Sequence, residues 1–475
     1  MSAKGSWKSS LVALAVSLSL AACAGLPPKP GPTDVPTVAP LSDFGGAGGA
    51  WPTEQWWKSY HDATLDQLVD MALATSPTLA TARARLHSAR QSVRIAGAQS
   101  GAQVDAVADA DRQRLSDSGL FPPRLLGFSA YNLYDLGLQA SYDFDWWGKQ
   151  KDTVESAMDE AHASQAERTA AALILASSVT DAYFAWQADQ SRLELVREKE
   201  ATVLRQGAIM ASRIRAQLEA GDEVHRTDAD LAAVREQIAG LEGAANLQVV
   251  ALAGLIGRSQ AELPALTMRP LPQVGGPLPD NVSIDLIARR ADITASRWRI
   301  EAAERTRDSA RAEFYPDISI NALIGVQSVD IGSLLKYGSR VPQVAGAIHL
   351  PIFDSGRLKA RYGAAQSAIE SAVASYQETL VGAARDVATQ AATRAQIASE
   401  RAQRVAAVDA AQKLIVSAAA RVRQGVIDSR AELTATESWI EQRDALLQLD
   451  AEALSTDIGL QRALGGGYER TKATP

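Results

Sequence analysis

The 475-residue sequence contains a single cysteine, Cys23, and aromatic residues make up only 5% of it. One thiol cannot form a disulfide within the chain, so no disulfide framework holds this fold together. Past the N-terminal region no run of 18 consecutive apolar residues occurs, so the sequence predicts no transmembrane helix. Few large side chains and abundant alanine favour long helices packed closely side by side over one thick globular core.

The sequence also lacks the common catalytic and cofactor-binding motifs. It has no GxSxG, no P-loop and no CxxC. Its five histidines are scattered, with no pair at metal-ligand spacing: His61, His87, His162, His225 and His349. We therefore predict a protein that is not an enzyme and that binds no cofactor or metal. The formal net charge of −7, without a basic cluster, argues against nucleic acid as a partner.

The first 22 residues have the pattern of a secretory signal peptide. Lys4 and Lys8 give a basic start, and the apolar run at 11–20 is shorter than the about 20 residues that span a bilayer as a helix. The run ends in LAAC, a bacterial lipobox pattern that predicts cleavage before Cys23 and acylation of its thiol. The alternative is an ordinary signal peptide followed by a stray cysteine.

Residues 23–50 are rich in proline and glycine and have no helical periodicity, as is typical of a tether. Ala24 stands where an aspartate would favour retention at the inner membrane. The segment therefore predicts a lipidated tether that anchors the chain, through acylated Cys23, to the Gram-negative outer membrane.

The rest of the chain contains two copies of one unit. Residues 76–94 align with 291–309, and FDWWGKQK at 144–151 matches FDSGRLK at 353–359. A spacing of a little over 200 residues indicates duplication of a whole supersecondary unit. We predict a first repeat at 51–264, an equatorial linker at 265–283, a second repeat at 284–467 and a C-terminal tail at 468–475.

Each copy changes from helical to strand periodicity in the same order. Alternation at period two predicts one β-hairpin at about 103–144 and another at about 316–353, with strands near 10 residues long. A tilted strand of that length crosses a membrane. Gly148 and Gly356 follow the hairpins, and we predict that they make the barrel-to-helix transition in a conformation that only glycine readily adopts. The alternative is a simple loop glycine.

Four strands with one apolar face cannot stand alone in a bilayer, because the two open edges would leave unpaired backbone groups in hydrocarbon. Sister copies arranged in a ring would close the sheet. The strand count alone does not fix the number of copies, and three copies would give 12 strands.

Long helical patterns follow each hairpin. From Gly148 to a predicted turn near 187–192 is about 40 residues, or roughly 60 Å at 1.5 Å per residue. The second copy runs similarly from Gly356 to a predicted turn near 395–400. We expect these helices to lie in the periplasm, with the turns at their tips.

Asp181 and Asp386 correspond between the copies and lie two or three turns before the predicted tips. A ring of such carboxylates facing the lumen would narrow a pore and favour cations, so we consider them periplasmic gate residues. The alternative is a solvated or salt-bridged outer face, with Arg385 as the partner of Asp386. We predict that Gly221 and Gly425 are equivalent helix breaks in the two repeats.

Five long segments carry a family resemblance in the same order along the chain. They are WWKSYHDATLDQLVDMALATSP (56–77), YDFDWWGK (142–149), RRADITASRWRIEAAERTRDSARAEFYPDISINALIG (289–325), PIFDSGRLKARYGAAQSAIESAVASYQETLVGAARDV (351–387) and ALGGGY (463–468). These segments resemble the TolC-type outer-membrane factors, especially the lipidated OprM/NodT-like subfamily of resistance-nodulation-division efflux systems. The resemblance covers nearly the whole chain past residue 50.

The resemblance implies a membrane α+β fold: a homotrimeric 12-stranded outer-membrane β-barrel, with four strands per chain, continued by a long periplasmic α-helical barrel. It implies a periplasmic adaptor protein and an inner-membrane resistance-nodulation-division pump as partners. The expected function is a passive export duct for small amphiphilic compounds such as drugs. The alternatives are the outer-membrane channel of a type I protein-secretion system and a lipid-anchored periplasmic helical scaffold without a pore.

Overall fold

The structure, a computed structural model, describes residues 48–118, 122–279 and 289–469, together with residues 28, 31, 33, 35 and 282. Cys23, the predicted signal peptide and most of the predicted tether lie outside the described residues.

The chain divides into two compact units, and each unit is assembled from both repeats. Among the described residues, the sheet unit comprises mainly 87–118, 122–163 and 296–375, whereas the helical unit comprises mainly 48–86, 164–279, 289–295 and 376–469. Each repeat thus contributes a hairpin to the sheet unit and most of its long helices to the helical unit. The boundary between the two sequence repeats therefore does not coincide with the boundaries between the two compact units.

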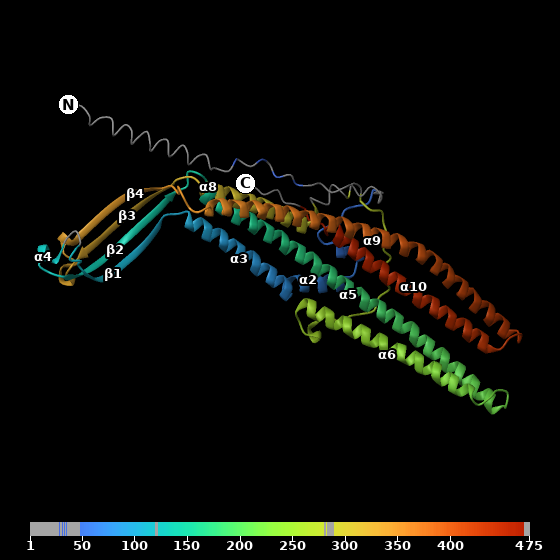
Figure 1. The fold of residues 1–475 in the computed structure, drawn as a ribbon. Helices are drawn as coiled ribbons and strands as arrows, with labels where there is room; N and C mark the ends of the chain where they lie inside the picture. The colour runs from blue at the N-terminus through green and yellow to red at the C-terminus, as the bar shows by residue number, and fades with distance from the viewer. Residues whose placement is uncertain are drawn as a thin grey trace. The chain divides into compact units, whose positions relative to one another are not determined.

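Four antiparallel strands form one sheet in the order β1-β2-β3-β4 (Figure 1). They are β1 (Gln103–Arg114), β2 (Ala130–Phe144), β3 (Asp317–Ser328) and β4 (Arg340–His349). Their lengths of 12, 15, 12 and 10 residues suit tilted strands that cross a membrane. The two predicted hairpins, and the four strands per chain, are confirmed. The short helix α4 (Pro123–Leu126) lies between β1 and β2, and η4 (Ile331–Ser333) and η5 (Tyr337–Ser339) lie between β3 and β4.

The long helices run further than the sequence indicated. Both α5 (Lys149–Arg215) and α9 (Arg357–Arg423) have 67 residues, so the turns predicted near 187–192 and 395–400 are wrong. Residues 187–192 and 395–400 contain neither glycine nor proline, and their polar side chains fit within a helix. Ser191 Oγ, for example, donates a hydrogen bond to the Gln187 carbonyl one turn earlier.

The helices instead end two residues before a left-handed residue. This residue is Gln217 (φ +60°) in the first copy and Gly425 (φ +70°) in the second. The Leu218 amide donates to the Arg213 carbonyl, and the Val426 amide donates to the Arg421 carbonyl, which is the same helix-ending turn. The structural equivalent of Gly425 is therefore Gln217, whereas Gly221 lies four residues later, in the turn before α6.

The returning helices are α6 (Glu223–Ile256) after α5 and α10 (Ser429–Ala463) after α9 (Figure 1). Leu193, Val196 and Val203 of α5 pack against Val234 and Leu241 of α6. An ion pair from Arg401 to Asp450 (2.6 Å) joins α9 to α10. Each repeat therefore forms a long helical hairpin.

Of the described helices, α6 alone is long and apolar enough, by length and composition, to cross a membrane, with a mean hydropathy of 1.4 over 18 residues. This is weak evidence for a span, because packed helices of soluble proteins pass the same test. The helix also pairs with α5 through Arg197–Glu242 and Arg235–Glu200, both at 2.8 Å. These charges suit an aqueous surface.

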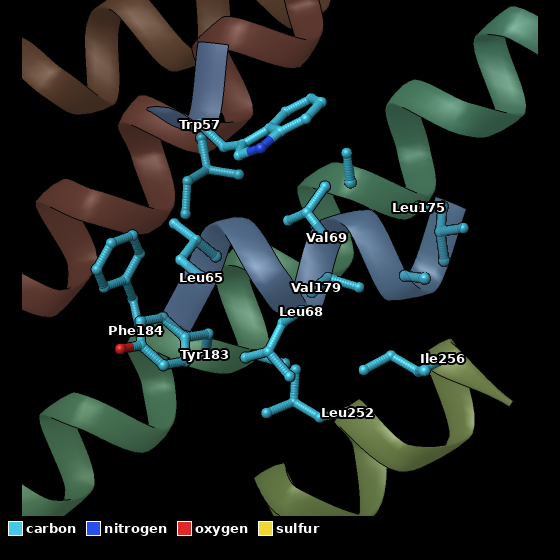
Figure 2. Packing of buried hydrophobic residues seen from close by; sticks show 14 of the residues in the cluster. Trp57, Leu65, Leu68, Val69, Leu175, Val179, Tyr183, Phe184, Leu252 and Ile256 are labelled. Carbon is cyan, nitrogen blue, oxygen red and sulfur yellow. The ribbon is translucent and has the colours of Figure 1, made fainter. Parts of the chain in front are cut away.

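The main core of the helical unit forms around α2 (Ala63–Thr75). Its buried residues, Leu65, Leu68, Val69 and Ala72, follow the i, i+3, i+4, i+7 spacing of one helix face. Figure 2 shows this face against residues of α5 and α6, including Val179 and Leu252. The helix begins at Asp62, whose carboxylate accepts hydrogen bonds from the Thr64 and Leu65 amides. It ends before Pro77, which starts α3 (Pro77–Gln99).

A run of three glycines follows α10 and has φ values of +92°, +56° and +81° at residues 465–467. A Cβ atom on Gly465 would overlap the Arg289 carbonyl oxygen, which lies just before α8 (Ala291–Ala312). A Cβ on Gly466 would overlap the Leu173 side chain of α5. This turn therefore depends on glycine for both its backbone conformation and its close contacts.

Replacing Gly466 by alanine should lower the free energy of unfolding by about 1–3 kcal/mol, because alanine strains a left-handed backbone and would displace Leu173. Thermal unfolding of the purified protein measures the effect. Gly240→Ala is the matched control: Gly240 lies inside α6 with no atom near the added Cβ, and alanine there should stabilise by about 0.5–1 kcal/mol. Equal stability of the two variants would contradict this role for Gly466.

Candidate functional site: sheet faces and helix tips

In all four strands, the even-numbered residues lie on one face of the sheet and the odd-numbered residues lie on the other. Pairs such as Leu138↔Ile324 and Ile318↔Ile348 place even-numbered residues of all four strands on one face. This even face is apolar over most of its area and carries no carboxylate. Its large side chains are exposed, with Ile324, Val344 and Ile348 between 72% and 74% accessible. A sheet face of this kind suits contact with hydrocarbon.

The odd face is polar and acidic. It carries six aspartates and no lysine or arginine: Asp105, Asp109, Asp111, Asp135, Asp143 and Asp317. Asp109 and Asp135 are direct cross-strand partners, and Gln327 Nε2 donates a 2.6 Å hydrogen bond to Asp135. Two like charges in register favour a hydrated surface over a packed one. The odd face is thus the one expected to line a water-filled lumen.

Aromatic residues gather where β2 ends and α5 begins. The Trp147 ring stacks on Tyr315 with centroids 4.6 Å apart, and its indole N–H donates to the Pro316 carbonyl at 2.9 Å. Trp146 is 67% exposed and contacts Phe144 edge to face. Exposed aromatic rings at a strand end are typical of the boundary between hydrocarbon and headgroups.

Gly148 and Gly356 lie where strand gives way to helix, with φ values of +80° and +85°. In each repeat an aspartate just before the glycine caps the helix that follows. Asp145 accepts from the Lys151 amide at 2.7 Å, and Asp354 accepts from the Leu358 amide at 2.7 Å. The left-handed glycine turns the chain so that the carboxylate meets the first helical amides.

Asp181 and Asp386 lie near the middle of α5 and α9, 34 and 37 residues before the helices end, so their predicted distance from the tips is wrong. Asp181 is exposed. The carboxylate of Asp386 pairs with Arg290 at 3.7 Å, whereas Arg385 is exposed and is not its partner. Arg290 also donates to the Ala463 carbonyl at 3.1 Å, which favours a structural role for this pair.

The tips of the two helical hairpins are joined by four charged residues that the sequence analysis did not identify. Arg213 pairs with Glu219 (3.1 Å) and Asp428 (3.2 Å), and Arg430 pairs with the same two carboxylates at 3.3 and 3.1 Å. We call these four residues the tip network. Hydrogen bonding of Asp428 to the Arg430 amide holds the pKa of its carboxyl below the usual value. The residues are far apart in sequence, so no local pattern shows their pairing.

We compared this architecture with known proteins. The outer membrane efflux protein family matches residues 68–258 and 282–466, one segment for each repeat. The chain belongs to this family. The two matched segments agree with the duplication found in the sequence.

Individual members are similar over almost the full chain. The multidrug resistance outer membrane protein MdtP of Escherichia coli K12 is 31% identical over 430 residues, covering 89% of this chain and 88% of MdtP. The crystal structure of the outer membrane protein VceC from Vibrio cholerae is 32% identical with a TM-score of 0.79, covering 88% of this chain and all of VceC. The MtrE outer membrane channel of Neisseria gonorrhoeae, in its open state, is 26% identical with a TM-score of 0.77, covering 94% of this chain and 99% of MtrE.

One further charged cluster of this efflux protein lies in the sheet unit, where α5 contacts α8. Arg305 of α8 pairs with Glu155 at 2.9 Å and lies 3.7 Å from Asp152. Burial raises the pKa of the nearby Asp159 carboxyl to about 6, and the charge of Glu301 contributes.

The raised pKa of Asp159 predicts the direction in which this residue makes the stability of the protein change with pH. Its ordinary value is 3.8, so the folded state holds the proton more tightly than the unfolded state does. Stability should therefore rise as pH falls from about 7.5 toward 4, and this contribution should be absent from Asp159→Asn. Thermal unfolding at pH 7.5 and at pH 4 measures this contribution. The control is Asp228→Asn, which changes an exposed residue of α6. A variant that keeps the pH slope of the native chain would contradict the assignment.

Proposed function

We propose that this outer-membrane efflux channel is a passive duct for small amphiphilic compounds, working with an inner-membrane resistance-nodulation-division pump through a periplasmic adaptor. The observation that carries the proposal is the sheet, with one apolar face, one acidic face and two open edges. Such a sheet satisfies its backbone in a bilayer only as part of a closed cylinder around water.

Closure by identical copies supports a homotrimer. Within one chain β1 and β4 each pair on one side only. Because the strands alternate in direction, β4 of one copy can pair antiparallel with β1 of the next. Three copies would form a 12-stranded barrel with its acidic faces inward.

A lipid anchor is supported by the sequence of the leader. The LAAC pattern ends in Cys23, the only cysteine in the chain. Acylation there would hold the chain at the outer membrane beside the barrel, with the helical part in the periplasm.

The partners are supported by the length and chemistry of the helices. At 1.5 Å per residue, α5 and α9 each reach roughly 100 Å. The sequence carries no P-loop, so the energy for export would come from the pump. An adaptor that binds the tips would shift the channel toward its open state.

The names of relatives favour drug efflux over type I protein secretion. MdtP and MdtQ are both described as multidrug resistance outer membrane proteins, and each is at least 31% identical to this chain. An acidic lumen would favour cationic amphiphiles among the exported compounds.

The tip network would hold the periplasmic end closed, since it ties the two hairpins of one chain together. Replacing Arg213 and Arg430 by alanine should open the channel and raise its conductance in planar bilayers. Loss of about 1 kcal/mol from the closed state changes the open population about fivefold.

Two comparisons make this experiment specific. Arg226→Ala removes a charge whose partner, within the described part of the chain, is Glu223 of its own helix, so it should leave the conductance unchanged. Asp181→Ala and Asp386→Ala test the carboxylate ring predicted from the sequence. If the conductance rises in these two variants but not in the variant that lacks Arg213 and Arg430, the constriction lies at mid-helix and not at the tips. A wild-type protein that never conducts would contradict the channel itself.

A further inference from the structure

Three arginines occupy the even face at the end of the sheet where the strand-connecting loops lie. They are Arg112 and Arg114 at the end of β1 and Arg340 at the start of β4. They are the only charged residues on this face, which is apolar over most of its area, and all three are exposed. A guanidinium in hydrocarbon is costly, so this end of the face must lie at the level of lipid headgroups.

No carboxylate neutralises these arginines within the described part of the chain. The six aspartates of the sheet all have odd numbers and therefore point to the opposite face. The Arg340 guanidinium lies over the Tyr337 ring, 4.3 Å from its centroid, which orients the group without pairing its charge. The arginines thus keep their hydrogen-bond donors available for an anion.

The loops beside the arginines are apolar where a loop in water would be polar. In the β3–β4 loop, Leu335 and Tyr337 are 81% and 79% exposed, and Leu125 of α4 is 70% exposed. Aromatic and aliphatic side chains next to arginine are typical of the headgroup layer of a membrane. This composition identifies a lipid surface, rather than a soluble protein, as the neighbour.

The two ends of the even face differ in charge. At the helix end, Tyr142, Phe144 and Ile348 continue the apolar surface with no basic residue. Within the strands, the basic residues of this face therefore gather at the loop end, where they would lie close to anionic lipid headgroups. Phosphate is the anionic group that most lipid headgroups share, and its oxygens match the planar donors of arginine.

We propose that Arg112, Arg114 and Arg340 form a binding site for the phosphate groups of lipid headgroups in the leaflet at the loop end of the barrel. This site rests on the proposed closed barrel. The arginines lie on the two edge strands, so closure of the sheet brings Arg340 of one copy onto the same side as Arg112 and Arg114 of the next. Each junction between copies would then hold one such site.

The test compares binding of diphosphoryl lipid A to the purified full-length protein and to the triple variant Arg112→Gln/Arg114→Gln/Arg340→Gln. The dissociation constant is measured with a fluorescent form of the lipid, and monophosphoryl lipid A serves as the probe with less charge. The triple variant should bind about tenfold or more weakly, and the native protein should prefer the diphosphoryl form. The corresponding triple lysine variant keeps the charge without the planar donors, so its affinity should lie between those of the native protein and the glutamine variant.

A matched control removes three exposed arginines from the long helices: Arg205, Arg215 and Arg421. Glutamine at these positions should leave lipid binding unchanged. Equal binding by the control and the sheet variant would overturn the site, and so would displacement of the lipid by millimolar inorganic phosphate. Conductance separates this inference from the proposed function: a triple variant that conducts normally yet loses lipid A supports the site, while a wild-type protein that does not conduct rejects the barrel.

Discussion

The structure depends on the need of every backbone amide and carbonyl in hydrocarbon to find a partner within protein. A four-stranded sheet meets this need for β2 and β3, and it leaves one side of β1 and of β4 open. The apolar even face requires lipid, while the acidic odd face requires water. A ring of identical copies provides both environments and closes the edges. Membrane location, oligomerisation and the presence of a lumen therefore follow from one constraint.

Duplication provides the parts of this ring in matching pairs. Each copy turns from strand to helix through a left-handed glycine and a capping aspartate, and each then continues as a helix of 67 residues. The two hairpins of helices meet at the tip network, where two arginines share two carboxylates. The membrane part is thus fixed by backbone pairing, whereas the tips are held by partly exposed ion pairs of modest strength. On the proposed function, this difference would make the tips, rather than the sheet, the movable part of the channel.

The strands could be predicted from the sequence because alternation at period two is a local signal, and Gly148 and Gly356 could be located for the same reason. The predicted helix ends are wrong because polar segments such as the one around Gln187 resemble turns in their local composition. In the structure, Arg192 there pairs with Asp444 of α10 at 2.8 Å, a contact that only tertiary structure provides. Gln217 was missed since a left-handed glutamine has no sequence signature. Pairing across hairpins, as in the tip network and Arg290–Asp386, likewise has no local pattern.

Pairing between β4 of one copy and β1 of the next is the central claim, and disulfide trapping tests it most directly. Ala108→Cys on β1 would be combined in turn with a cysteine at each even position of β4 from Pro342 to Gly346, so that the unknown register is scanned. Paired strands lie about 4.8 Å apart, within the range a disulfide bridges. The account predicts covalent trimers in membranes for at least one register and none for Ala108→Cys alone. Monomers in every register would contradict it.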